Sequence, residues 1–375
     1  MLRRIAGLAF ASSLALSLLA CASASAALTP GQILVASHTH DSLLLIDPAT
    51  GKQSRFAENG LPVNAGSAYF TSPGDIAIAP SGRIYVIDSS AFDGNGGVIA
   101  VDPNTGKQTE ISANDQPVNA SAPLFDSPNG IALTPSGKIL VVDRSAFSIN
   151  GGVIAVDPAT GKQSVFSSNT QPVNAGSPLF EDLRGGITVL RSGTVVVGNS
   201  GSHPGLIAID PATGEQSRFS TTDQPVNASS HTFELAVGSV ESVSGRIFVS
   251  DQNGPTPVSD NEGGVIGVNP ATGKATRASD NNLAVNASSQ FFSNPFDITF
   301  GLDGRLVVLD TGAFGSSGCG DSEGCGGLIS VNPLTGREAV ISSNTQAVNM
   351  AAPLFHAISG LAVVPPRCLG RTATI

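Results

Sequence analysis

The residues of this chain whose types could do chemistry are a few acids and histidines that interrupt a regular repeat. Three acids, Asp75, Glu234 and Asp297, precede short apolar runs at places where other copies of the repeat have glycine. The glycines are Gly130, Gly186 and Gly360. Carboxylates that face one space can bind a hard cation such as Ca²⁺, which takes several oxygen ligands. A solvated acid at the start of a strand is the competing interpretation.

Histidines form a second candidate group. His38 and His40 follow an apolar run near the N-terminus, and His356 lies near the C-terminus, in a segment that we expect to pack beside that run. Imidazole is a common metal ligand and a natural base. These three residues are therefore candidates for a catalytic base, although hydrogen-bonded loop histidines would give the same pattern. His203 and His231 form a further pair with the same two interpretations.

The elements that must position these residues come from a repeat. The motif Asp-Pro-x-Thr-Gly, with Asn for Asp in two copies, occurs six times, and its glycines lie 53 to 63 residues apart. Each unit has four short apolar runs separated by Pro-Ser-Gly-like and Pro-x-Thr-Gly turns, in the second unit 75–79, 83–88, 97–102 and 108–112. Four-stranded units at a fixed period predict an all-β fold, a six-bladed β-propeller. No segment after residue 27 has the apolar period of a long helix.

The phase of the repeat predicts how the ring closes. The first unit opens on Gly31-Gln-Ile-Leu-Val, which matches a second strand, and the chain ends its last unit on Gly360-Leu-Ala-Val-Val-Pro365, which matches a first strand. We therefore expect residues 361–364 to pair with residues 33–36 and complete the first blade. This closure leaves no open edge at the seam.

Two further polar sets recur in the blades. Each connector between blades has Val-Asn and, six residues after the Asn, a Phe; we expect the Asn to tie loop backbone and the Phe to pack between neighbours. The ends of the second strands are also polar, and these side chains could bind a cation or, as we favour, cap the following loop. They are Ser37, Asp88, Asp143, Asn199, Asp251 and Asp310.

The N-terminus has the layout of an export signal over residues 1–26: Arg3 and Arg4, an apolar run, then small residues. The segment contains two alternative sites at which the signal could be cleaved. Leu18-Leu-Ala-Cys21 resembles a lipobox that would acylate Cys21, whereas Ala24-Ser-Ala26 fits an ordinary signal peptidase, which we favour. We expect residues 27–366 to form the propeller and residues 367–375 a tail, in an exported protein of the periplasm or the extracellular space, with no later membrane span.

Composition limits the partners. The formal net charge is −10 and only 13% of residues are charged, so the chain lacks the basic surface that a phosphate backbone requires. Nucleic acid is therefore not an expected partner. There is no Trp and there are two Tyr, which argues against a sugar site built on aromatic platforms. We expect a monomer that binds a protein or a small molecule.

The cysteines predict one disulfide. Cys319 and Cys325 are separated by five residues in a Gly-rich loop, and an oxidising compartment would permit their pairing. A metal site at this pair is the weaker interpretation, because no further Cys or His lies at ligand spacing. Cys368 has no evident partner.

The stretch Ser127-Pro-Asn-Gly-Ile-Ala-Leu-Thr-Pro-Ser-Gly-Lys-Ile-Leu-Val-Val-Asp143 resembles the blade signature of NHL-repeat propellers and of the regucalcin/gluconolactonase family. That family holds one divalent cation in the channel through Glu, Asn and Asp side chains and opens lactones or hydrolyses esters. The resemblance matches Asn129 to the family's Asn and lets Asp297 or Asp75 stand for its Asp. The family's Gly-Glu-Gly-Pro glutamate has no match.

These observations give three functional hypotheses. The first is an exported, non-enzymatic propeller that presents its loop-rich rim to a partner or small ligand, because the chain has no complete catalytic set. The second is a lactonase or esterase that uses one cation, Ca²⁺ or Zn²⁺, held by Asp75, Asn129, Glu234 and Asp297. The third is a lyase similar to streptogramin lyases with a histidine base. Metal analysis of the purified protein separates the first hypothesis from the others.

Overall fold

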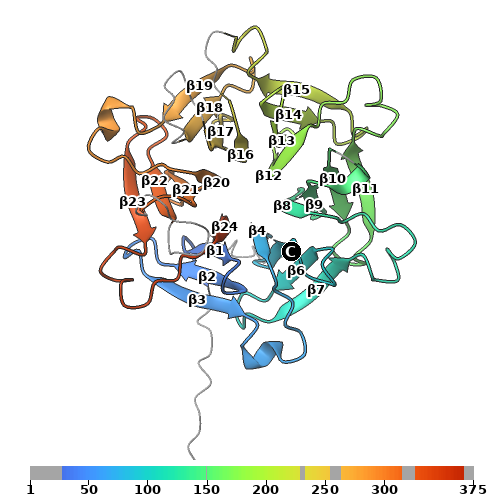
Figure 1. The fold of residues 1–375 in the computed structure, drawn as a ribbon, viewed down its shortest axis with the longest axis horizontal. Helices are drawn as coiled ribbons and strands as arrows, with labels where there is room; N and C mark the ends of the chain where they lie inside the picture. The colour runs from blue at the N-terminus through green and yellow to red at the C-terminus, as the bar shows by residue number, and fades with distance from the viewer. Residues whose placement is uncertain (1–27, 149, 229–232, 254–262, 315–325, 367–375) are drawn as a thin grey trace, which may run out of the picture.

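A computed structural model describes residues 28–148, 150–228, 233–253, 263–314 and 326–366. The described strands form six separate four-stranded antiparallel sheets, arranged as blades around a central axis (Figure 1). The fold is therefore the six-bladed β-propeller that the repeat predicts. The only helices among the described residues are three single turns of 3-10 helix: η1 (Pro62–Asn64), η2 (Ala146–Ser148) and η3 (Ala284–Asn286).

Each blade runs from an innermost strand at the channel to an outermost strand at the circumference. The first three blades are β24 (Ile358–Val363), β1 (Ile33–Ser37), β2 (Ser42–Ile46), β3 (Gln53–Glu58); β4 (Pro73–Ile78), β5 (Ile84–Asp88), β6 (Gly97–Val101), β7 (Gln108–Ala113); and β8 (Pro128–Leu133), β9 (Ile139–Asp143), β10 (Gly152–Val156), β11 (Gln163–Ser168). The other three are β12 (Asp182–Val189), β13 (Val195–Ser200), β14 (Gly205–Ile209), β15 (Gln216–Thr221); β16 (Ala236–Glu241), β17 (Ile247–Asp251), β18 (Gly264–Val268), β19 (Ala275–Ser279); and β20 (Pro295–Phe300), β21 (Leu306–Asp310), β22 (Gly327–Val331), β23 (Glu338–Ser343).

The expected ring closure is confirmed. The C-terminal strand β24 pairs antiparallel with β1, with Val35 opposite Leu361 and Ile33 opposite Val363. Peptide hydrogen bonds extend the pairing past the strand ends, from Gly31 N–H to the Val364 carbonyl (2.9 Å) and from Val364 N–H to the Gln32 carbonyl (2.8 Å). The first blade is thus built from both ends of the described chain.

The hydrophobic core consists of six clusters, and each cluster lies between two neighbouring blades. The middle strands are buried along all or nearly all of their length, because neighbouring blades cover both faces of each sheet. Such strands are continuous apolar runs, here rich in Val and Ile. Each cluster contains the connector Phe that the sequence singles out: Phe70, Phe125, Phe180, Phe233, Phe292 and Phe355.

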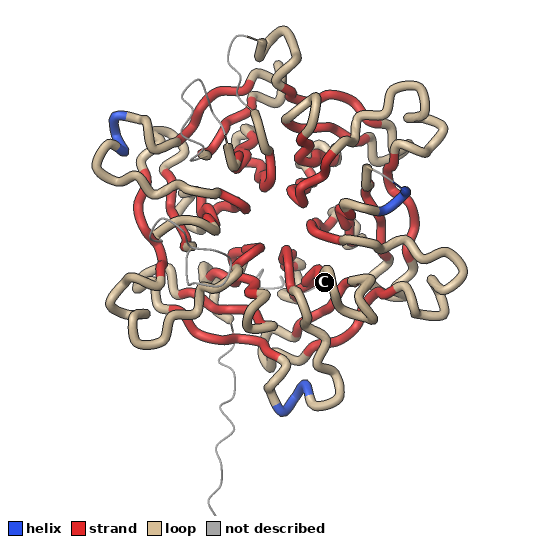
Figure 2. Tube along the Cα trace, viewed as in Figure 1, coloured by secondary structure: helices blue, strands red, loops and turns tan. Residues whose placement is uncertain are grey.

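The connectors project outward at the circumference as six similar loops (Figure 2). In each, the Asn side chain is buried and joins two blades. Asn119, for example, donates from Nδ2 to the carbonyls of Ala113 (2.9 Å) and Gly161 (3.0 Å), and its Oδ1 accepts the Gln163 N–H (2.9 Å). The expected role of the asparagines as backbone ties is confirmed.

Candidate functional site: the central channel

The innermost strands bring Asp75 and Asp297 to the channel at equivalent positions of the second and sixth blades. The sequence alignment that placed Glu234 at the same level of the fifth blade is wrong. Glu234 precedes β16, is exposed, and its N–H donates to the carboxylate of Asp251. Gly238 occupies the equivalent place: an added Cβ there would lie 2.9 Å from Asp297 Cα. Two acids and four glycines therefore form this level of the channel.

Glycine is required where the innermost strands approach most closely. A Cβ added to Gly130 would lie 1.7 Å from the Gly185 carbonyl oxygen, and one added to Gly186 would lie 1.6 Å from the Val237 oxygen. Real side chains cannot tolerate such contacts, so only Gly allows this convergence. The channel is consequently narrow at this level on the side of the third to fifth blades.

The two acids hold neighbouring innermost strands. Asp75 accepts its own strand's Ile76 N–H on Oδ1 (2.7 Å) and the Ile131 N–H of the third blade on Oδ2 (2.9 Å). Asp297 repeats this pattern with the Ile298 N–H (2.7 Å) and the Leu361 N–H of the first blade (2.9 Å). Each carboxylate therefore links two blades at the channel.

Burial makes the charge of these acids costly. It raises the pKa of Asp75 well above its usual range, and the nearby carboxylate of Asp297 raises it further. Burial also raises the pKa of Asp297 to about 6, although the Leu361 and Ile298 N–H groups oppose the shift. A cation between the two acids would stabilise both ionised forms.

A small cavity of about 20 Å³ lies between these strands. Asp75, Asn129, Arg184, Asp297 and Ser359 line it together with glycines. This volume holds about one water molecule or one ion. Asn129 Nδ2 donates to the Leu183 carbonyl (3.2 Å), but its Oδ1 is buried without a hydrogen-bond partner. The structure thus brings Asp75, Asp297 and Asn129 together, and adds two polar residues that the sequence did not indicate, Arg184 and Ser359.

The polar side chains around the cavity include both possible cation ligands and a positive charge. No group of three or more His, Cys, Asp or Glu residues in the described ranges is arranged to hold a metal ion. Two carboxylates and one amide oxygen are oxygen ligands of the kind that Ca²⁺ and Mg²⁺ accept, with water as the remainder. Arg184 adds a positive charge to this lining. Its guanidinium forms an ion pair with the Asp182 carboxylate, with 2.7 Å between Nη2 and Oδ2.

The acids at the ends of the second strands serve the loops, as we favoured. Asp88 accepts N–H groups from Thr71, Ser72, Ser90 and Ala91 at 2.8 to 3.0 Å. Asp143 and Asp310 repeat this pattern in their own blades. These carboxylates are fully buried and already bonded, so they position loop backbone at the rim.

The three candidate histidines do come together beside the first blade. The rings of His40 and His356 meet edge to face, with centroids 5.5 Å apart. His38 Nδ1 lies 3.3 Å from the Ser72 hydroxyl. Burial lowers the pKa of His40, and the charges of Arg55 and His356 lower it further. None of the three histidines lines the channel cavity.

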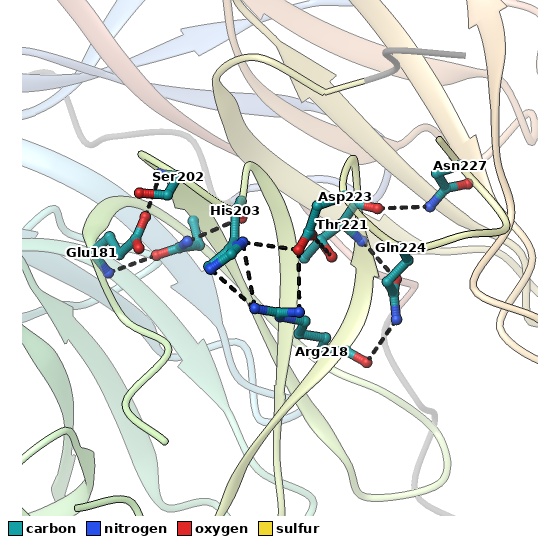
Figure 3. A network of polar contacts seen from close by, with 9 residues as sticks. Glu181, Ser202, His203, Arg218, Thr221, Asp223, Gln224 and Asn227 are labelled. Atoms are coloured by element: carbon teal, nitrogen blue, oxygen red, sulfur yellow. Dashed lines mark hydrogen bonds and ion pairs between the residues drawn. The ribbon is translucent and has the colours of Figure 1, made fainter. Parts of the chain in front are cut away.

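A polar network at the fourth blade includes His203 (Figure 3). Its Nδ1 lies 2.9 Å from the Asp223 carboxylate, while Arg218 contacts both His203 Nε2 (3.0 Å) and Asp223 (3.1 Å). The hydroxyl of Thr221 also donates to Asp223 (2.6 Å). With a proton on Nδ1, a neutral His203 donates to Asp223 and accepts from Arg218, so both ring nitrogens are used. The network orders a loop and leaves no nitrogen for a base.

Several sequence predictions fall outside the described residues. They are the export signal with Cys21, the Cys319–Cys325 pair, His231 and the tail after residue 366. In the described part of the chain, no helix is long and apolar enough to cross a membrane.

The fold and its channel define a six-bladed β-propeller, and comparison with known proteins gives its family. A family model described as the outer membrane protein assembly factor BamB matches residues 149–365, more than half of the chain. The chain belongs to this family. No curated protein matched the sequence.

Solved structures share the fold at low sequence identity. A protein of unknown function from Bacteroides caccae is 13% identical, with a TM-score of 0.54 over 90% of this chain and 99% of its own. TolB from Acinetobacter baumannii is 14% identical, with a TM-score of 0.54 over 89% of this chain and 67% of its own. A gluconolactonase from Xanthomonas campestris is 12% identical, with a TM-score of 0.45 over 76% of this chain and 84% of its own. The TM-scores of the first two structures establish a common fold alone.

Proposed function

We propose that the protein is an exported propeller scaffold that binds a protein partner through the connectors on its rim, without catalysis. The connectors are the six loops that join the outermost strand of one blade to the innermost strand of the next. Their tips form a ring around the circumference (Figure 2).

The observation that carries this proposal is an exposed valine at every connector tip. Each lies immediately before the buried Asn, follows Pro or Ala, and is 39% to 46% exposed. The six are Val63, Val118, Val173, Val226, Val285 and Val348. The buried Asn and Phe already meet the structural needs of the connector, and a polar residue at the tip would expose less apolar area to water. Repeated exposed apolar residues that rigid turns present suit contact with another protein.

Three further observations support the proposal. The chain belongs to a family described as an outer membrane protein assembly factor, and it shares its fold with TolB. One of the solved structures with the same fold is an extracellular domain, which agrees with export to the periplasm or the extracellular space. The channel cavity of about 20 Å³ is far below the roughly 300 Å³ at which small-molecule sites begin, so a lactone or ester does not fit there.

Site-specific photo-crosslinking in the protein's native cells tests the proposal. A photoreactive amino acid replaces Val118 or Val173, and a control replaces Leu334, which is 92% exposed in the turn between β22 and β23 of the sixth blade. We expect a discrete crosslinked protein from both connector positions and none from Leu334. Absence of adducts at all six connector tips, or the same adducts at Leu334, would contradict the proposal.

A second candidate function, binding of one divalent cation in the channel, rests on a separate observation. The buried Oδ1 of Asn129 has no hydrogen-bond partner, and it lines the same cavity as Asp75 and Asp297. A buried acceptor that lacks a donor is costly, and a bound cation would satisfy it. The cation would link the second, third and sixth blades through these three residues.

Calorimetric titration with Ca²⁺, Mg²⁺ and Zn²⁺ tests this candidate. The parent protein should bind one ion per chain, and Asp75→Asn with Asp297→Asn should abolish binding, because charge is lost while side-chain size is kept. Glu234→Gln is the matched control, since Glu234 does not line the cavity, and it should bind like the parent. No heat of binding in the parent, or loss of binding in the Glu234 variant, would reject the channel site.

A further inference from the structure

A groove on the fifth blade combines two basic side chains with polar neighbours. It has a volume of about 540 Å³ and is lined by Arg246, Lys274, Ser244, Asn269 and Thr276, together with Gly267, Pro270 and Ala271. These residues belong to the hairpin turns and adjoining strand ends of β16 to β19. The groove lies beside the connector of the fourth blade, whose Asn227 donates to the Gly273 carbonyl (3.1 Å) and accepts the Ala275 N–H (2.8 Å).

The guanidinium of Arg246 is held in place within this groove. It lies over the ring of Phe248, with 5.2 Å from Cζ to the centroid, and Nη2 donates to the Thr276 hydroxyl (2.9 Å). It also lies directly against Gly267, where an added Cβ would be 2.3 Å from Nη2. The absence of a side chain at Gly267 therefore allows Arg246 to lie along the sheet, partly buried, where it lines the groove.

The second blade contains an equivalent groove that serves as an internal comparison. Arg83 and Lys107 take the places of Arg246 and Lys274, and the groove measures about 420 Å³. Arg83 is exposed and lies farther from its ring, 5.6 Å above Tyr85, because Ala100 occupies the place of Gly267. Asp102 lines this second groove, so a carboxylate offsets the two cations.

The fifth blade lacks that carboxylate. Its turn begins with Asn269, which caps the Ala271 N–H (2.9 Å) as Asp102 caps the Asn104 N–H (2.9 Å), but without a charge. Glu241 of the same blade accepts the Arg191 N–H on Oε2 (2.7 Å) and does not line the groove, although its Oε1 lies beside Gly245, next to the groove residue Pro270. The described lining of the fifth-blade groove thus contains two cations with hydroxyl and amide groups and no carboxylate.

We propose that this groove binds a tetrahedral oxyanion group, as found in phosphate and sulfate esters. Arg246 would bind two oxygens through its planar fork, and Lys274 would bind a third as a mobile point charge. The hydroxyl of Ser244 and the amide of Asn269 supply additional donors, whereas the Thr276 hydroxyl already donates to the Gly267 carbonyl (3.2 Å) and helps to hold Arg246. No connector residue lines the groove, so binding there is tested separately from the proposed partner binding.

Titration with glucose 6-phosphate and with galactose 6-sulfate, followed by calorimetry at low salt, tests the site. We expect saturable binding of at least one ester, weakened by added sodium chloride. Loss of one charged contact by Arg246→Gln or Lys274→Gln should weaken binding about tenfold or more. Gly267→Ala should have a similar effect, because the new Cβ displaces the guanidinium while every charge is retained.

The matched control is Lys107→Gln, which removes the equivalent charge from the second blade and should leave the affinity unchanged. Binding of the phosphate ester alone or of the sulfate ester alone identifies the group that the site prefers. The proposal is overturned if neither ester binds the parent protein, or if Lys107→Gln weakens binding as much as Lys274→Gln does.

Discussion

Glu338 should make the stability of the protein depend on pH. It is 3% exposed at the start of the outermost strand of the sixth blade. Four other blades have a buried glutamine at this position: Gln53, Gln108, Gln163 and Gln216. The carboxyl group of Glu338 therefore stands where the fold otherwise uses a neutral amide.

The hydrogen bonds around Glu338 differ from those around the equivalent glutamines. In the third blade, Gln163 Nε2 donates to Ser112 Oγ (3.3 Å), and that hydroxyl donates to the Gly161 carbonyl (2.7 Å). In the sixth blade the equivalent Ser279 hydroxyl lies 2.6 Å from the Gly336 carbonyl and 2.9 Å from Glu338 Oε1. The single hydroxyl proton of Ser279 is shared between these two oxygens, and Asn286 Nδ2 also donates to Glu338 Oε1 (2.7 Å).

The magnitude follows from the pKa. Burial, with smaller contributions from Asp280 and Asp310, raises the pKa of Glu338 from 4.5 to about 7, although hydrogen bonds from Ser279 and Phe291 oppose the shift. Below about pH 4.5 both the folded and unfolded states are protonated, and the group has no effect. Between about pH 4.5 and 7 only the unfolded chain ionises, so the free energy of unfolding falls with rising pH. Above about pH 7 the loss reaches roughly 3 kcal/mol.

Urea unfolding followed by circular dichroism at pH 5 and pH 8 checks this prediction. Glu338→Gln should raise the free energy of unfolding by up to about 3 kcal/mol at pH 8 and by much less at pH 5. The reciprocal variant Gln163→Glu should destabilise the third blade at pH 8. Comparison of variants at each pH isolates this carboxyl group from others whose pKa is raised, such as Asp310. Equal effects of Glu338→Gln at both pH values would refute the reasoning.

Three further predictions concern the fold. Truncation after Phe355 removes β24, and it should lower the melting temperature sharply and broaden the transition; an unchanged melting temperature would contradict the ring closure. Asn119→Ala should cost about 3 kcal/mol of unfolding free energy, because three buried hydrogen bonds between blades are lost, and a cost under about 1 kcal/mol in urea unfolding would argue against that role. Mass mapping of exported protein should find Cys319 and Cys325 joined, and detection of two free thiols would reject the disulfide.

The architecture could be predicted from the sequence because its signals are local and repeated. Each Asp-Pro-x-Thr-Gly turn begins with a side chain that caps its own backbone, as Asp47 does for Ala49, and ends on a glycine with positive φ, as at Gly51 (φ 73°). Six copies set the blade number, and their phase gives the seam. The predicted ends of individual strands were less accurate. β4 begins at Pro73, two residues before the expected start at Asp75, because Pro73 already pairs with Asp88 and the regular pairing resumes at Ile76 after an irregularity.

The site was harder to predict because it joins residues from several blades. Glu234 looked equivalent to Asp75 and Asp297, but the residue that follows the connector Phe by five positions in the fifth blade is Gly238, as Asp75 follows Phe70 in the second. The contact of Asp223 with His203 joins residues from different loops, which no sequence spacing reveals. Glu338, by contrast, could have been found from the sequence. An alignment of the six outermost strands shows that four blades have glutamine at the position where the sixth has this acid.

Partner binding through the connectors is most directly tested by an affinity measurement. The protein that crosslinks at Val118 and Val173 is purified, and its dissociation constant for the propeller is compared between the parent and a Val118→Asp, Val173→Asp variant. Both valines are exposed at connector tips, so the variant should fold and melt like the parent. We expect the affinity to fall about tenfold or more, since a charge at a contact point must be desolvated without a partner. An unchanged dissociation constant, with the fold intact, would contradict the claim that the connectors form the binding surface.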